Sequence, residues 1–181
     1  PLPHDLTGLQ QEANTRLGMA AGETLSVVQR LYERGYVSYP RTRCRHIPED
    51  IFEQAPTLVA SLKRHPRFGR HAERLLENGL NPHAVDGNSV TEHHALLITG
   101  EVPEGLSPDE QNIYSLIAGR MLEAFSEGCV RENVRVRVDY GGMEFETETS
   151  CVKYPGWRDI YNGPDMVEES NPLPQFHQGE T

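Results

Sequence analysis

The sequence predicts an α+β fold, in which a mainly helical domain is followed by a β-hairpin or strand segment of a second, partial β domain. Up to residue 128, apolar side chains recur at helical spacing in segments bounded by capping residues, glycine or proline. Beyond that point, apolar or threonine side chains alternate with charged ones, which is the period of a strand. We therefore divide the chain into a helical domain at 1–128, a β segment at 129–161 and a tail or linker at 162–181.

Two helices are expected first, at about 5–16 and 22–34. Thr7 and Gln10 have the spacing of a capping box at the start of the first helix. The second helix carries Tyr32 on the same face as its aliphatic residues, so we expect this side chain to be a core aromatic. Both helices are followed by glycine, which is common just after the last helical turn.

Three further helices complete the helical domain. One is expected over 48–64, broken or restarted at Pro56. Another covers 68–78, and a loop rich in turn-forming residues follows at 81–90. The last helix, 107–128, has the strongest start signal, because serine is followed by proline and then by glutamate at the spacing of a capping box.

The β segment has the pattern of a hairpin. Valines alternate with charged residues over 134–139, Gly141 and Gly142 turn the chain, and glutamates alternate with apolar residues or threonine over 143–149. The glutamates share one face of their strand, and no ligand partner converges on them in the sequence. We interpret them as a solvated edge and not as metal ligands: Glu144, Glu146 and Glu148.

The composition indicates a soluble globular protein with an uneven charge distribution. Its 181 residues are 36% hydrophobic and 24% charged, and no apolar run is long enough to span a membrane. The net charge of −10 argues against general nucleic-acid affinity. Arginines gather at 29–45, whereas the chain from Pro164 onward is acidic. Any contact with nucleic acid is therefore expected to be local to the arginine-rich segment.

The cysteines indicate the cellular compartment, and the first residues indicate whether the chain is part of a longer protein. Cys44, Cys129 and Cys151 stand far apart, without the Cys-x-x-Cys spacing of a zinc site or the density of a disulfide scaffold. This usage fits a reducing cytoplasm. The chain begins without methionine or a signal-peptide pattern, so we interpret it as a piece of a larger protein.

The stretch at 36–45 carries the residues best suited to chemistry. Tyr39 precedes a proline, which disfavours helical geometry, so the phenol is expected on a stiff turn after the second helix. Arg41, Arg43 and Arg45 follow it closely. An oxygen nucleophile beside fixed positive charge suits phosphodiester chemistry. Because a free phenol has a pKa of about 10, cationic neighbours have to favour its ionised form.

Two motifs carry a family resemblance. The run Ser-Tyr-Pro-Arg-Thr at 38–42 follows a helix that ends in Leu-Tyr-Glu, and the run Glu-His-His-Ala-Leu-Leu-Ile-Thr lies at 92–99. They resemble the active-site segment and the histidine box of type IA DNA topoisomerases, most closely the topoisomerase III branch. The resemblance extends over about residues 6–161. It departs from the family at 43–44, where Arg-Cys replaces Asp-Ser or Gly-Ser, and at Ile98, which replaces a proline.

The resemblance implies a reaction and a set of site residues. Tyr39 is expected to attack single-stranded DNA, leaving a 5′-phosphotyrosyl link and a free 3′-hydroxyl, and the strand is resealed after another strand has passed. Transesterification conserves the bond energy, so no nucleotide cofactor is needed. Arg41 is expected to clamp the phosphate, and His93 to assist at it. Contacts to the DNA backbone are expected from four further residues: Gln29, Thr42, Arg43 and His94.

The resemblance also implies what lies outside the chain. Family members cleave DNA with Mg²⁺ held by an acidic Toprim domain, which we expect before Pro1, so this chain is predicted to hold the nucleophile without a metal site. The helical domain is expected to act as a gate, and 129–161 as part of a β-rich arch. The predicted partners are single-stranded DNA and the remaining domains of the same polypeptide, in the cytoplasm and with no membrane.

Two other interpretations fit the residues. His71 and Arg74 give the His-x-x-Arg pattern of a tyrosine recombinase, followed by Tyr154 and Tyr161, although Tyr39 then has no role. The other is a non-catalytic interaction module, in which Tyr39 is a buried turn tyrosine beside surface arginines. Convergence of the tyrosine and the histidine box in the fold discriminates between these interpretations.

Overall fold

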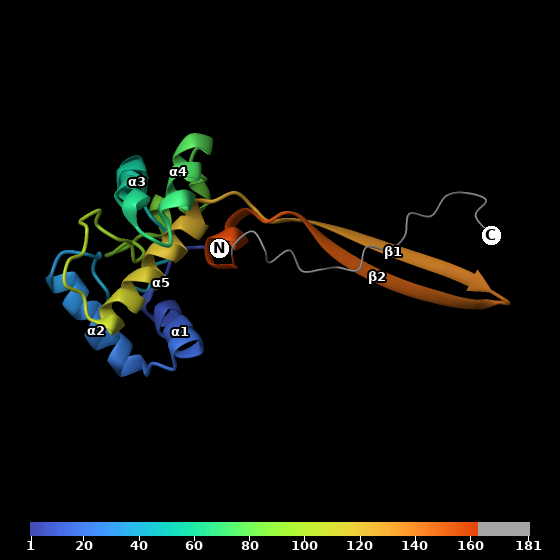
Figure 1. Ribbon diagram of the computed structural model, residues 1–181, viewed down its shortest axis with the longest axis horizontal. Coiled ribbons are helices and arrows are strands. Elements are labelled where there is room, and N and C mark those ends of the chain that lie inside the picture. Colours follow the sequence, from blue (N-terminus) through green and yellow to red (C-terminus); the bar gives the residue numbers. More distant parts are fainter. Residues whose placement is uncertain (163–181) are drawn as a thin grey trace. The chain divides into compact units, whose positions relative to one another are not determined.

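The computed structural model describes residues 1–162, and the predicted α+β fold is confirmed (Figure 1). The chain divides into two compact units, Pro1–Glu127 and the part from Gly128 onward. The first unit is helical, and the second contains a two-stranded sheet. The predicted tail lies outside the described residues except for Asn162, which ends a short helix. No helix in the described part combines the length and apolar character needed to cross a membrane.

The helical unit is organised around its last helix, α5. In Figure 1, α5 lies between α1 and α2 on one side and α3 and α4 on the other. Short 3₁₀ turns connect the middle of the unit. The bounds of these elements are α1 (Leu6–Leu17), α2 (Ala21–Glu33), α3 (Glu49–Ser61), η1 (Leu62–Arg64), α4 (Gly69–Asn78), η2 (Pro82–Ala84), η3 (Gly87–Ser89) and α5 (Pro108–Phe125).

The sequence of α5 explains its central place. The predicted capping box is confirmed: Glu110 N donates to the Ser107 hydroxyl at 3.3 Å, and the Glu110 carboxylate accepts from Ser107 N at 2.9 Å. From Ile113 to Phe125 most side chains are buried, and the Phe125 ring packs edge-on against Phe52 of α3 at 5.8 Å between centroids. Each large apolar side chain buried in this way contributes roughly 1.5–3 kcal/mol, so α5 supplies much of the core.

The predicted cap of the first helix is wrong. Asp5 caps α1, because its carboxylate accepts a hydrogen bond from Gly8 N at 2.7 Å. Thr7 lies one residue inside the helix, where its N–H is one of the unpaired donors and its side chain no longer precedes the first turn. Aspartate and threonine are both good N-caps, so the sequence could not decide between Asp5 and Thr7. The position at which the helix begins depends on how the preceding residue, His4, is held by Leu96.

The predicted interruption at Pro56 is also wrong. Pro56 lies inside α3, which continues to Ser61. Proline there removes one backbone hydrogen bond and crowds the preceding turn. Ala55 and Val59 are completely buried on the same helix, and this tertiary packing offsets the local cost.

The second unit confirms the predicted hairpin. Strands β1 (Val130–Tyr140) and β2 (Met143–Tyr154) pair antiparallel, with Val138 opposite Phe145. Gly141 and Gly142 form the turn with φ of 62° and 79°, a left-handed geometry that favours glycine at both positions. A 3₁₀ turn η4 (Gly156–Arg158) and helix α6 (Asp159–Asn162) follow.

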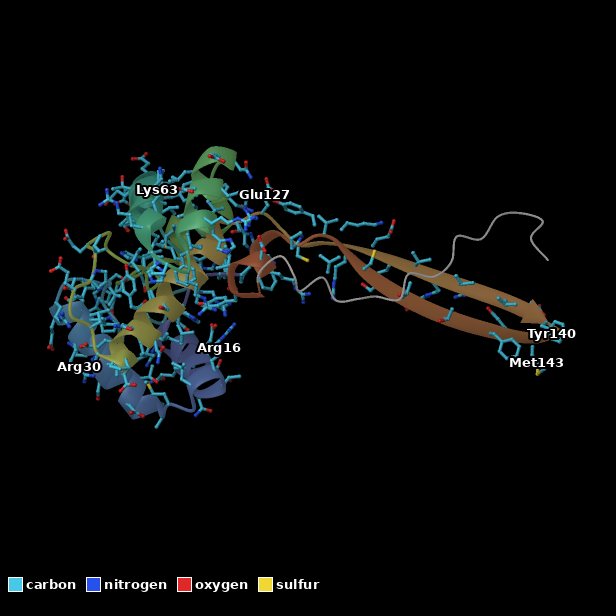
Figure 2. All side chains as sticks on the ribbon, viewed as in Figure 1. Arg16, Arg30, Lys63, Glu127, Tyr140 and Met143 are labelled. Carbon is cyan, nitrogen blue, oxygen red and sulfur yellow. The ribbon has the colours of Figure 1, made fainter. Side chains whose placement is uncertain are left out.

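The two faces of the hairpin differ in chemistry. On one face the three glutamates of β2 are paired with arginines of β1; the shortest contact joins Arg137 Nε and Glu146 at 2.8 Å. The opposite face exposes apolar side chains, with Phe145 at 54% and Met143 at 60% exposure, and Figure 2 shows Tyr140 and Met143 at the turn. A two-stranded hairpin of this kind is only marginally stable by itself.

A buried ionic network holds the start of the chain. His4 is 2% exposed, its Nε2 lies 2.9 Å from the Glu12 carboxylate, and its carbonyl accepts from Leu96 N at 2.8 Å. Burial alone raises the pKa of Glu12, but the hydrogen bond from His4 and the charge of Arg120 outweigh it and lower that pKa to about 2. Burial raises the pKa of Glu123, on the other side of Arg120, to about 7. The network therefore anchors the segment that pairs with the histidine box.

Candidate active site

The segment after α2 and the histidine box form a short antiparallel pairing. Val37 and Ile98 are bridge partners, and both are buried. Ser38 N donates to Leu97 O at 2.9 Å, and Thr99 N donates to the carbonyl of the residue before Val37 at 3.1 Å. Two segments about sixty positions apart in the sequence are thereby held in a fixed register next to Tyr39.

Two hydroxyl groups add side-chain bonds to this pairing. The Ser38 hydroxyl donates to Ala95 O at 3.3 Å and accepts from Leu97 N at 3.0 Å. The Thr42 hydroxyl donates to His93 O at 3.2 Å and accepts from the N–H of the cysteine two residues later at 3.0 Å. Thr42 is 3% exposed. It therefore fixes the backbone of His93, and its side chain points into the protein.

Tyr39 lies in irregular backbone, as predicted from the following proline. The helix before it ends at Glu33, and Gly35 reverses the chain with φ of 78°. The Tyr39 side chain is half-buried, and its ring centroid lies 4.3 Å from the His93 ring with 39° between the planes. The structure thus brings the predicted nucleophile into direct contact with the predicted assisting histidine.

Tyr32 is not the core aromatic that the sequence predicted. Its side chain is 39% exposed, and its ring lies edge-on to Tyr39 at 5.5 Å between centroids. The reason is its position around the helix: the preceding residue, Leu31, is completely buried, and Tyr32 lies at the edge of the buried stripe of α2. The Tyr39 ring therefore contacts Tyr32 on one side and His93 on another, and such aromatic contacts restrict its rotation.

An open pocket of about 480 Å³ is lined by His93, whose ring contacts Tyr39; Tyr39 itself is not among the lining residues. Arg41 and Arg43 contribute exposed guanidinium groups to it, and neither has a hydrogen bond or ion pair among the described residues. One wall comes from the segment after Tyr39 and the other from the loop that leads to the histidine box. The lining residues are Arg41, Thr42, Arg43, Cys44, Ser89, Thr91, Glu92 and His93. A phosphate group entering this pocket meets two guanidinium groups and the imidazole.

Two predicted contact residues lie elsewhere. Gln29 is on α2, where its amide donates to Glu33 at 3.1 Å, and it does not line the pocket. His94 is half-buried and its Nδ1 lies 2.7 Å from Ala95 O, so its ring turns toward its own backbone. Contact of Gln29 and of His94 with DNA stays a prediction.

Sequence reasoning missed part of the site. Tyr32 carried a usable signal, because a tyrosine in the last turn of a helix that leads straight to Tyr39 is close to it by chain geometry. Ser89 and Thr91 carried none, since the loop has no periodicity and its position depends on long-range pairing. That pairing joins Ile47 to the residues on either side of Val85, with Ile47 N donating to Ala84 O at 3.0 Å.

The metal predicted for the reaction does not fit the residues described. Among residues 1–162, no group of three or more histidine, cysteine, aspartate or glutamate side chains is placed to hold an ion. The glutamates of β2, which were the nearest candidates in the sequence, contact arginines. No step of the chemistry proposed below is assigned to a metal held by this chain.

The Thr42 hydroxyl is expected to stabilise the backbone that carries His93. In a Thr42→Val variant, His93 O and a backbone N–H lose their buried partner, which costs about 1–3 kcal/mol in the free energy of unfolding. Urea denaturation followed by circular dichroism measures the loss. The control is Thr42→Ser, which keeps the hydroxyl. Equal stability of the valine and serine variants would contradict this role.

The fold and the pocket define a tyrosine-bearing domain, and comparison with known proteins identifies its family. The sequence profile described as DNA topoisomerase matches residues 1–181. The chain therefore belongs to the DNA topoisomerase family, in its type IA class. This membership leaves the tyrosine recombinase interpretation without support.

Individual relatives agree. The chain is 36% identical over 95% of its length to DNA topoisomerase 1 of Methanothermobacter thermautotrophicus and 34% identical over 98% to DNA topoisomerase 3 of Bacillus licheniformis. It covers 23% and 26% of those proteins, so it spans about a quarter of the curated relatives it matches. The solved structure of full-length topoisomerase I from Thermotoga maritima has the same fold, with a TM-score of 0.70 over 99% of this chain, 29% of that chain and 22% identity.

Proposed function

We propose that this chain supplies the nucleophile of a type IA DNA topoisomerase and that Tyr39 is the residue. The observation that carries the proposal is the contact between the Tyr39 and His93 rings at 4.3 Å, beside a pocket with two unpaired guanidinium groups. Tyr39, Arg41 and His93 come from the two motifs that resemble the family, whereas Arg43 stands where the sequence departs from it. Arg41 is assigned to the scissile phosphate, and Arg43 to the neighbouring backbone together with Gln29 and His94. Thr42, whose hydroxyl donates to His93 O, is assigned to holding that histidine in place.

The proposed step is a transesterification. The Tyr39 oxygen attacks phosphorus and forms a phosphotyrosyl bond as the bond from phosphorus to the 3′ oxygen breaks. The phenol loses its proton and the departing 3′ oxygen gains one, and His93 is placed to assist this exchange. Arg41 stabilises the charge that develops on the phosphate oxygens. The reverse step reseals the strand after another strand has passed, and no nucleotide is consumed.

The rest of the proposed enzyme lies outside these residues. We assign Mg²⁺ to a Toprim domain elsewhere in a longer polypeptide, because the chain spans only about a quarter of its relatives. The exposed apolar face of the hairpin also calls for a covering partner, which the remaining domains supply. A cytoplasmic location and membership of the topoisomerase III branch complete the proposal. Relatives named DNA topoisomerase 1 and DNA topoisomerase 3 both match, so the branch assignment rests on the motifs.

The isolated chain is expected not to cut DNA. A labelled single-stranded oligonucleotide incubated with the 181-residue chain and Mg²⁺ is expected to remain intact, because the acidic metal-binding half of the site is absent from the described residues. Denaturing gel electrophoresis measures cleavage. Cutting by the pure chain at Tyr39 would refute the division of the site between two domains.

The complete enzyme is expected to attach to the 5′ end of the cut strand. An oligonucleotide labelled at its 3′ end should carry the label into the covalent protein complex, whereas a 5′ label should appear on the released fragment. Mass spectrometry of the labelled peptide is expected to place the phosphate on Tyr39. A 3′ linkage, or attachment to Tyr154 or Tyr161, would instead indicate the recombinase chemistry.

A further inference from the structure

The unpaired cations of the helical unit form two groups. Most of its arginines have defined partners: Arg120 contacts Glu12 and Glu123, and Arg34 contacts Glu110. Among the described residues of this unit, five cationic side chains have no hydrogen bond or ion pair. Arg41 and Arg43 lie near Tyr39, and the other three lie at a second location: Lys63, Arg64 and Arg70. We call the second group the α4 cation patch. In a chain with a net charge of −10, two concentrations of uncompensated positive charge are notable because acidic partners are plentiful.

The α4 cation patch lies apart from the tyrosine. Lys63 and Arg64 belong to η1, Arg70 is in the first turn of α4, and all three side chains are exposed. In Figure 2, Lys63 lies at the end of the helical unit formed by α3 and α4, whereas Arg30 lies at the opposite end on α2. Over residues 63–74 the only acidic residue is Glu73, so a polyanion meets little repulsion there.

A cavity of about 500 Å³ opens beside this patch. Its size is within the range of about 300–1,000 Å³ that small ligands occupy. Arg64 and His65 form one rim, and the loop residues Val102 and Leu106 form an apolar wall. Together the wall and the rim offer both a surface for a flat ring and charge for an attached anion.

Tyr114 contributes a polar group inside the cavity. The side chain lines it, yet the residue is only 3% exposed and its hydroxyl has no hydrogen-bond partner among the described residues. Burial raises the pKa of Tyr114 to about 12, so the hydroxyl stays protonated and can donate to a ligand at neutral pH. The hydroxyl is not fully enclosed by protein atoms, so an acceptor bound in the cavity can reach it.

The cavity and the tyrosine segment are joined by one loop. Thr99, which pairs with the tyrosine segment, begins the loop that reaches Leu106 at the cavity. In the same loop the carbonyl of Glu104 accepts a hydrogen bond from Arg34 of the turn after α2, and its N–H donates to the Tyr36 hydroxyl at 3.4 Å. The loop that lines the cavity is therefore tied by hydrogen bonds to the segment that leads to Tyr39.

We propose that the α4 cation patch and this cavity form an accessory site for single-stranded nucleic acid. Backbone phosphates contact Lys63, Arg64 and Arg70, and one unstacked base enters the cavity against the apolar wall and the Tyr114 hydroxyl. Single strands bind in this way to cations beside a surface that accepts a base, whereas a duplex hides its bases. The inference rests on the proposed function for DNA as the polyanion, and the site is distinct from the pocket beside Tyr39, with which it shares no lining residue.

The electrostatic part is tested with a fluorescent oligothymidine and the 181-residue chain, by anisotropy over a range of salt concentrations. The triple variant Lys63→Gln/Arg64→Gln/Arg70→Gln is expected to bind at least about 10-fold more weakly at low salt. The slope of log affinity against log salt is expected to fall by about 2, since each lost phosphate contact contributes about 0.7.

The matched control changes the net charge equally. Arg135→Gln/Arg137→Gln/Lys153→Gln removes hairpin cations that are paired with glutamates, and it is expected to leave the salt slope unchanged. Circular dichroism melting confirms that both triple variants are folded. Equal loss of binding in the two folded variants would show a general charge effect and overturn the proposal.

The base-binding part is tested by changing the ligand. The chain is expected to bind oligothymidine about 10-fold more tightly than an abasic oligomer of the same length, and to bind a duplex more weakly still. Tyr114→Phe removes only a hydroxyl and is expected to reduce the preference for the base. Equal affinity for the thymidine and abasic strands overturns the cavity assignment. None of these affinities requires covalent capture of DNA by Tyr39, so the result stands or falls separately from the proposed reaction.

Discussion

Replacement of Tyr39 by phenylalanine is expected to abolish covalent capture of DNA and relaxation of supercoils by the complete enzyme. The variant keeps the ring that contacts His93 and Tyr32, and it loses only the oxygen that attacks phosphorus. The substitution removes the atom that forms the covalent bond, so the rate is expected to fall at least about 10⁴-fold. Gel relaxation of plasmid DNA and covalent trapping of a labelled oligonucleotide measure the two losses.

A matched control is available three residues earlier. Tyr36→Phe also removes one phenolic hydroxyl, whose described contact is a hydrogen bond from Glu104 N at 3.4 Å. This variant is expected to retain capture and relaxation, and binding of single-stranded DNA is expected to be unchanged in Tyr39→Phe. Covalent capture by Tyr39→Phe would exclude Tyr39 as the nucleophile and end the proposed mechanism.

Replacement of His93 by asparagine is expected to slow cleavage by about 10²- to 10⁴-fold, the range in which a positioned acid or base contributes. The imidazole is exposed, contacts the Tyr39 ring, and lines the pocket with Arg41 and Arg43. Asparagine retains a hydrogen-bonding side chain but cannot exchange a proton near neutral pH. Single-turnover cleavage with the complete enzyme separates this effect from DNA binding.

The neighbouring histidine provides the comparison. His94→Asn makes the same chemical change one residue later, where the ring turns toward the carbonyl of Ala95. We expect it to alter affinity for DNA more than the rate of the chemical step. A larger loss of single-turnover rate in His94→Asn than in His93→Asn would reverse the roles assigned to the two residues.

Several features of the fold could be predicted because their causes are local. The capping box of Ser107 and Glu110 marked the start of α5, and the two glycines at 141 and 142 marked the hairpin turn. The proline after Tyr39 placed that residue outside a helix. Each of these signals acts within a few residues, so no knowledge of the tertiary structure was needed to interpret it.

Other features could not be predicted because distant segments decide them. Asp5 and Thr7 are both good caps, and the chain before α1 is held by Leu96. Tyr32 has the spacing of a core residue, but the buried stripe of α2 runs through Val28 and Leu31 and leaves Tyr32 at its edge. Thr42 is a residue type that can contact DNA, but its hydroxyl is already hydrogen-bonded to His93 O and to a backbone N–H.

The sequence alone determined the order of helices and hairpin, the non-helical backbone at Tyr39 and the motifs that carry the family resemblance. Only the tertiary structure decided which groups surround the phenol. The antiparallel bridge between Val37 and Ile98 brings His93 to Tyr39, and the loop before the histidine box completes the pocket around Arg41 and Arg43. Backbone pairing between segments so far apart depends on burial of the whole core, and no local pattern of residues specifies it.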